Sequence, residues 1–144
     1  MTLSTYAANS SPGTPLAGVE YRPGVCNIGP AEIARRRRAG HVGLLVTLAV
    51  LAGLVAIDAP PLARLIVGLP AAAAASGYLQ AWLKFCAGFG SRGIFNFGPV
   101  GDSQEVVDED ARARDRAGAN RIGLASLAIG VAVGVVAAVI PFGA

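Results

Sequence analysis

The chain has 144 residues, of which 53% are hydrophobic and only 15% are charged, and its formal net charge at pH 7 is +3. Because soluble domains carry about 25% charged residues, this composition argues against a soluble globular protein. It predicts an all-α integral membrane protein with three transmembrane helices, an interfacial N-terminal helix and a helical cytoplasmic extension of the third span.

The N-terminal part is predicted to contain a tail and a short helix. Residues 1–19 are rich in Ser, Thr, Ala, Gly and Pro, which predicts a flexible tail. Residues 20–40 are expected to form a cytoplasmic turn and then an interfacial helix, which Pro30 can begin because its missing N–H is not needed there. Glu32 lies in the first turn of that helix and can reach Arg36 at i+4. The helix either lies along the lipid headgroups or continues at an angle through Gly40 into the first span.

Three uncharged stretches predict the spans: residues 41–57, 65–83 and 122–142, with an external turn at 58–64. The last stretch has no polar face, and at about 1.5 Å per residue it covers roughly 30 Å, the thickness of the hydrocarbon core. Pro70 is expected to kink the second span or to begin its regular helix. Tyr78 and Trp82 stand at the end of this span, where aromatic residues suit the headgroup level.

Between the second and third spans, residues 84–121 are predicted to form a Gly/Phe-rich cytoplasmic loop and then a charged helix. Residues 85–101 hold four of the five Phe residues, and their Gly content argues against a stable helix. We therefore expect an irregular segment with Phe side chains in the membrane interface or against a neighbour. From residue 102 onwards acids precede arginines, which matches the helix dipole, so a helix capped by Asp102 or Ser103 should lead into the third span.

The distribution of basic residues predicts the orientation. Eight arginines lie next to the ends of the first and third spans and are interpreted as topogenic: Arg35, Arg36, Arg37, Arg38, Arg112, Arg114, Arg116 and Arg121. The 58–64 turn holds only Arg64. The positive-inside rule then places the N-terminus in the cytoplasm and the C-terminus outside. Because the topogenic role of these arginines accounts for the positive net charge, no nucleic acid partner is expected. The preference for Arg over Lys, with abundant Ala and Gly, is typical of a high-GC bacterium and favours a bacterial plasma membrane.

Few residues could carry chemistry. The sequence contains one His and two Cys, and it has no nucleophile motif, P-loop or dinucleotide fingerprint. The spans contain no Asp, Glu, Lys or Arg, whereas proton-coupled transporters normally hold an ionisable residue there. Cys26, His41 and Cys86 are expected near the cytoplasmic interface, but a structural zinc site needs four ligands. We therefore predict no catalytic residue, no cofactor and no metal, and no disulfide in that reducing compartment.

Small residues at four-residue spacing predict where helices pack closely, because such grooves let backbones approach each other in lipid. The third and second spans carry the predicted helix-packing residues Ser126, Gly130, Gly134, Ala138, Gly68, Ala72 and Ser76. The first span has Ala49 and Gly53 at the same spacing. Whether these grooves meet helices of this chain or of another subunit is open at the level of sequence.

These patterns predict a function without catalysis. We expect a small accessory or structural subunit of a larger bacterial membrane protein complex, whose partners are the lipid bilayer and other membrane subunits. One alternative is a homo-oligomeric channel or carrier whose pore forms on assembly. Another is a cofactor-binding membrane protein that uses His41 or the cysteines.

Overall fold

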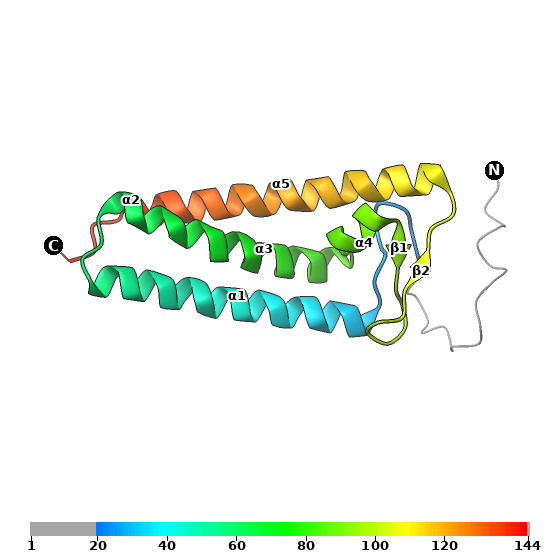
Figure 1. The fold of residues 1–144 in the computed structure, drawn as a ribbon, viewed down its shortest axis with the longest axis horizontal. Helices are drawn as coiled ribbons and strands as arrows, with labels where there is room; N and C mark the ends of the chain where they lie inside the picture. Colours follow the sequence, from blue (N-terminus) through cyan, green and yellow to red (C-terminus); the bar gives the residue numbers. More distant parts are fainter. Residues whose placement is uncertain (1–19, 144) are drawn as a thin grey trace.

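The computed structural model describes residues 20–143. Three long helical runs lie side by side along an elongated molecule, and shorter elements cover one end (Figure 1). The runs Pro30–Ala56, Pro61–Leu83 and Glu109–Val139 are each long and apolar enough to cross a membrane. The prediction of a mostly helical chain with three helices that could span a membrane is thereby confirmed. The predicted flexible tail, residues 1–19, lies outside the described residues.

The first run is a single helix, α1 (Pro30–Ala56). Of the two arrangements expected for the helix that begins at Pro30, the structure has the continuation through Gly40 into the first span, and residues 30–40 form no separate interfacial helix. Pro30 does begin the helix, as expected. Gly40 does not interrupt it, because this position packs closely against the second run: a Cβ atom on Gly40 would lie 2.9 Å from the ring of Tyr78.

The second run starts earlier than predicted and has three parts: α2 (Pro61–Arg64), a 3-10 turn η1 (Leu65–Val67) and α3 (Gly68–Leu83). Pro70 lies in the first turn of α3, where a missing N–H leaves no hydrogen bond unmade. It therefore marks the beginning of the regular helix. The helix ends at Lys84, whose backbone is left-handed with φ 55°.

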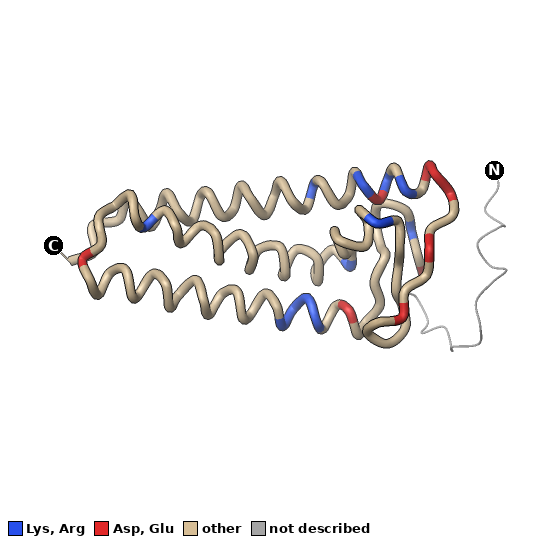
Figure 2. The backbone as a smooth tube through the Cα atoms, in the orientation of Figure 1, with Lys and Arg blue, Asp and Glu red and all other residues tan. Residues whose placement is uncertain are grey.

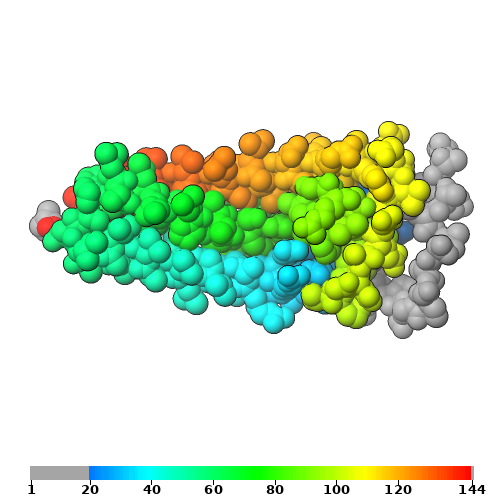
Figure 3. All heavy atoms as spheres, in the orientation of Figure 1, coloured from blue at the N-terminus to red at the C-terminus, as the bar shows by residue number. Residues whose placement is uncertain are grey.

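The helix α3 lies between α1 and α5 (Glu109–Val139), as the space-filling view also shows (Figures 1 and 3). On one side, a Cβ atom on Gly43 would lie 2.8 Å from the Cα of Ala74. On the same side, one on Gly77 would lie 2.5 Å from the nitrogen of Gly40. Because lipid supplies no hydrophobic force between helices, such close backbone contact is a main source of their association.

The opposite side of α3 contacts α5 through some of the predicted packing residues. A Cβ atom on Gly130 would lie 2.6 Å from the backbone oxygen of Gly68 and from the Cβ of Ala72. One on Gly134 would lie 2.8 Å from the backbone oxygen of Leu65. The structure thus brings these grooves together within one chain.

The remaining predicted packing residues lie differently. Ser126 is buried, and its hydroxyl donates to the backbone oxygen of Ile122 at 2.7 Å. Ser76 instead accepts a hydrogen bond from Gln80 at 2.8 Å. Ala138 is only half-buried, because its neighbour Ala137 takes the buried position in the last turns of α5. On the first span Ala49 and Gly53 are exposed, and Gly40 and Gly43 make the close contacts instead.

Residues 20–29 and 84–108 form a polar head at one end of the bundle, packed on the first turns of α1 and α5. The head contains α4 (Ala87–Arg92) and two short antiparallel strands, β1 (Ile94–Phe95) and β2 (Gln104–Glu105). The segment predicted to be irregular therefore has regular elements. Its glycines make room for the buried ring of Phe85, since a Cβ atom on Gly90 would lie 2.7 Å from that ring.

The helix α5 begins at Glu109, with Asp108 as its N-cap, rather than after Asp102 or Ser103. The reason is that residues 104–105 pair with β1, and the N–H of Val106 donates to the backbone oxygen of Gly93 at 2.8 Å. The chain therefore stays extended until that pairing ends. From Glu109 the helix runs without a break to Val139, so the charged helix and the third apolar stretch are one element.

Candidate functional site at the polar head

Charged residues gather at the end of the bundle that carries the polar head, whereas the opposite end holds only Asp58 and Arg64 among the described residues (Figure 2). The eight arginines predicted to be topogenic all belong to the first turns of α1 and the first half of α5. The two helices thus start at the same end and place their basic residues at that end.

Asp115 of α5 is one of two buried acids in this region, and its side chain is fully buried. One carboxyl oxygen accepts a hydrogen bond from the hydroxyl of Tyr21 at 2.7 Å, and the other accepts from the N–H of Gly24 at 2.7 Å. The Tyr21 ring in turn stacks on Phe95, with centroids 4.8 Å apart. Asp115 therefore fastens the N-terminal segment to α5 and, through Tyr21, to β1.

Asn27 joins the N-terminal segment to the start of α4. Its side-chain oxygen accepts from the N–H of Cys86 at 2.6 Å, and its side-chain nitrogen donates to the oxygen of Cys86 at 3.0 Å. Its backbone N–H donates to the oxygen of Lys84 at 3.2 Å, and its backbone oxygen accepts from the N–H of Asn96 at 3.0 Å. The fully buried Asn27 thus uses both its side chain and its backbone to connect three segments.

Asn96 and Gln80 make similar connections. The side chain of Asn96 donates to the oxygen of Pro99 and accepts from the N–H of Gly98, each at 2.8 Å. It also donates to Glu32 on α1 at 3.5 Å. Gln80 accepts from the N–H of Ala87 at 3.0 Å and so connects the end of α3 to α4. A buried amide that is bonded in this way stabilises a particular chain path.

A cluster of charged side chains lies around Arg36, where the first turns of α1 meet the head. Glu32 is 1% exposed, and its carboxylate lies 3.7 Å from Arg36 and 3.8 Å from Arg35. The pair of Glu32 with Arg36 is the one that the sequence predicted. Arg36 also donates to the sulfur of Cys86 at 2.9 Å and lies 5.8 Å from the ring centroid of Phe89. These contacts attach the start of α1 to α4. Cys86 is itself only 1% exposed, so its sulfur faces protein groups and not solvent.

Cys26, His41 and Cys86 have different surroundings. Both cysteines are free and buried, and Cys26 faces the backbone oxygen of Ile28 at 3.9 Å. Burial raises the pKa of the Cys26 thiol, against the opposing effects of that bond and of Arg22 and Lys84. His41 is exposed, with Nδ1 2.7 Å from the hydroxyl of Tyr78. Within residues 20–143 no group of three or more His, Cys, Asp or Glu is arranged to hold a metal ion.

At the opposite end of the bundle Arg64 is 93% buried, as its side chain packs over the C-terminal residues. It donates to the backbone oxygen of Ile140 at 3.2 Å, and its guanidinium lies 5.5 Å from the ring centroid of Phe142. Arg64, the single basic residue of the predicted external turn, therefore connects α2 to the chain that follows α5.

Sequence reasoning missed Asp115, Asn27, Asn96 and Gln80. A signal for Asp115 was present, because it shares one helical face with Ala111, Gly118 and Ile122 at spacings of four, three and four residues. An acid on a face of small and apolar residues indicates a buried anchor. The two asparagines gave no such signal, since the side chain of Asn27 bonds the backbone of a distant segment and that of Asn96 bonds its own turn and Glu32 of α1.

Comparison with protein-family models, with curated proteins and with solved structures gave no match to this chain. The functional interpretation therefore depends on the geometry described above.

Proposed function

We propose that this chain is a small non-catalytic accessory or structural subunit of a larger bacterial membrane protein complex. The observation that carries the proposal is the use of the buried polar side chains in the head. Asp115 and Asn27 bond backbone groups of segments that are distant in sequence, and the side chain of Asn96 bonds Pro99 of its own turn and Glu32 of α1. A general acid or base must be able to reach a proton on the substrate, whereas these groups are engaged in holding the head on the bundle.

Exposed apolar side chains in the head favour a protein partner. Val25, Val100 and Val107 are 53%, 52% and 85% exposed. All three lie outside the three apolar helices, so the hydrocarbon of the bilayer would not cover them. Burial of such side chains against another subunit removes apolar surface from water at about 25 cal/mol per Å². A head with exposed valines is well suited to contact a neighbouring subunit.

The proposed location is the bacterial plasma membrane, with the chain crossing it three times. The concentration of basic residues at the head end supports a cytoplasmic head and N-terminus and an external C-terminus (Figure 2). The Arg64 end would then face outward.

The test is affinity purification of the tagged full chain from its own host in a mild detergent, followed by quantitative mass spectrometry. We expect unrelated membrane subunits to co-purify in a fixed ratio. Val107→Asp should lower their recovery at least tenfold, which corresponds to about 1.4 kcal/mol of lost association free energy. Ser103→Asp adds the same charge at an exposed polar position of the same loop and is the matched control.

Recovery of the chain alone would contradict the proposal. Recovery as a homo-oligomer that conducts ions in bilayers would also contradict the proposal and would support the channel instead. Equal loss of the partners from Val107→Asp and Ser103→Asp would show that the contact does not depend on the exposed valine at position 107.

A further inference from the structure

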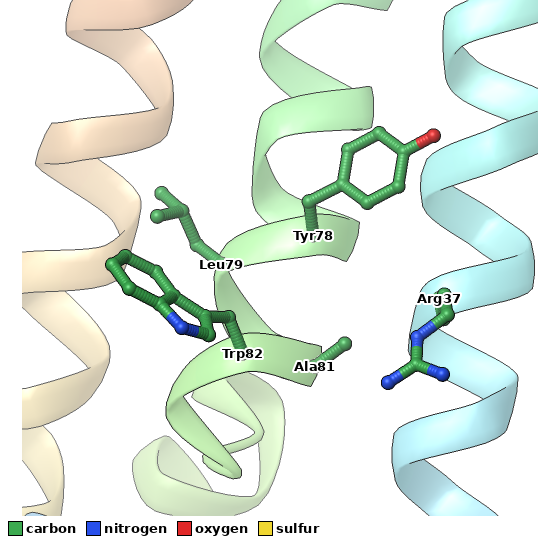
Figure 4. Close-up of a pocket in the computed structure, with 5 residues that line it drawn as sticks. All are labelled: Arg37, Tyr78, Leu79, Ala81 and Trp82. Atoms are coloured by element: carbon green, nitrogen blue, oxygen red, sulfur yellow. The ribbon is translucent and has the colours of Figure 1, made fainter.

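A groove of about 350 Å³ lies on the surface of the bundle next to the polar head (Figure 4). Arg37 of α1 lines it together with Tyr78, Leu79, Ala81 and Trp82 of α3. Figure 4 shows Arg37 extending from α1 towards α3, with Trp82 and Leu79 on the other side of α3. The lining is thus largely apolar, and its polar groups are the guanidinium at its edge, the hydroxyl of the tyrosine and the indole N–H of the tryptophan.

Arg37 and Arg38 have no hydrogen-bond or ion-pair partner within the described part of the chain, and of these two only Arg37 lines the groove. Arg35 and Arg36 pair with Glu32, whereas none of the hydrogen bonds or ion pairs among residues 20–143 involves Arg37, whose side chain is exposed. Its guanidinium therefore stands at the groove without a counter-charge. A guanidinium presents several N–H donors in a planar arrangement that matches the oxygens of a phosphate.

The groove lies at the level where the apolar run ends. Trp82 is 80% exposed and belongs to the last turn of α3, and the polar head follows at Lys84. The Tyr78 ring is held in place by the 2.7 Å contact between its hydroxyl and His41 Nδ1. Exposed aromatic residues at the end of a span are typical of the headgroup region of a bilayer.

We propose that this groove binds an anionic phospholipid, with the phosphate on Arg37 and an acyl chain along Leu79 and Trp82. Basic pockets between transmembrane helices attract anionic headgroups. A helix of another subunit is a poorer occupant, because apolar packing would bury the Arg37 charge without a counter-charge at a cost of several kcal/mol per ion. The inference is independent of the proposed accessory function.

The single tryptophan of the chain is itself the probe, because Trp82 lines the groove. The full chain would be reconstituted in phosphatidylcholine vesicles that contain either brominated phosphatidylglycerol or the same fraction of brominated phosphatidylcholine. Bromine quenches tryptophan only at short range, so quenching reports which lipid occupies the groove. We expect a roughly fivefold preference for phosphatidylglycerol, which corresponds to about 1 kcal/mol for one basic residue near the surface.

Arg37→Gln should abolish this preference, whereas Arg37→Lys should keep part of it. Arg38→Gln removes the same charge from the next position of α1, which does not line the groove, and should leave the preference unchanged. Circular dichroism and the Trp82 emission maximum in phosphatidylcholine check that each variant is folded. Equal quenching by both brominated lipids in the wild-type chain would overturn the proposal. Equal loss of the preference in Arg37→Gln and Arg38→Gln would also overturn it, because the attraction would then belong to the basic surface as a whole.

Discussion

Asp115 is the residue on which the attachment of the N-terminal segment depends. Replacing it by alanine leaves the hydroxyl of Tyr21 and the N–H of Gly24 without their acceptor. Hydrogen bonds to a charged group contribute about 1.5–3 kcal/mol each, so we expect Asp115→Ala to destabilise the attachment of this segment by about 3 kcal/mol. Hydrogen exchange of the peptide that contains Gly24 should accelerate by about two orders of magnitude if the segment opens locally.

The control for this prediction is Asp102→Ala, at an exposed position of the head. It should leave the exchange of the Gly24 peptide unchanged. Equal exchange rates in Asp115→Ala and the wild-type chain would mean that Asp115 is not the anchor.

The thiol of Cys26 should react slowly in the folded protein. Burial raises its pKa, so at any given pH below that pKa a smaller fraction is thiolate, the form that reacts with alkylating reagents. Intact-mass measurement after treatment with iodoacetamide at pH 7.5 should show no alkylation of Cys26 or of the equally buried Cys86. Both should be alkylated after unfolding in detergent and urea. Rapid modification of Cys26 before unfolding would contradict its buried position.

At the scale of the elements, the close contact between α5 and the second run is sensitive to substitution. A Cβ atom on Gly134 would already lie 2.8 Å from the backbone oxygen of Leu65, and a leucine there must push α5 away from the second run. Overpacking of this kind costs about 1–3 kcal/mol or more. We expect Gly134→Leu to insert into the membrane but to lower the midpoint of thermal unfolding in detergent clearly.

Val135→Leu is the matched control, because Val135 is the next residue of α5 and is 47% exposed. It should unfold like the wild-type chain. If Val135→Leu were destabilised and Gly134→Leu were not, the packed face of α5 would lie elsewhere.

Long elements were the part of the fold that the sequence could predict. A run such as 122–142 contains no charged residue and is long enough to cross the bilayer, and those two properties alone predict a helix that could span it. The continuity of α1 through Gly40 depends instead on a tertiary contact with Tyr78. Local signals at residues 30–40 carry no information about that contact.

The polar head was hidden from sequence reasoning for a similar reason. Asn27 lies far from Cys86 and Asn96 along the chain, and its hydrogen bonds go to backbone groups of both of their segments. A glycine-rich stretch such as 85–101 looks irregular when it is read alone. It becomes ordered because the ring of Phe85 fills the space that Gly90 and Gly118 leave open. The prediction of an irregular loop was wrong because these long-range contacts cannot be read from the local sequence.

At the scale of the whole molecule, the account depends on one claim: the bundle crosses the membrane with its polar head in the cytoplasm. Residues 60 and 105 lie towards opposite ends of the molecule, next to α2 and in β2 (Figure 1). Both positions are exposed, so a cysteine at either one is open to a maleimide. The two native cysteines are buried and give little background.

The direct test is therefore labelling of Pro60→Cys and Glu105→Cys with a membrane-impermeant maleimide, before and after the membrane is opened. The predicted result is that Pro60→Cys reacts in intact cells, whereas Glu105→Cys reacts only after permeabilisation. Reaction of Glu105→Cys in intact cells, or reaction of both positions from the same side, would contradict the arrangement of the bundle and its head.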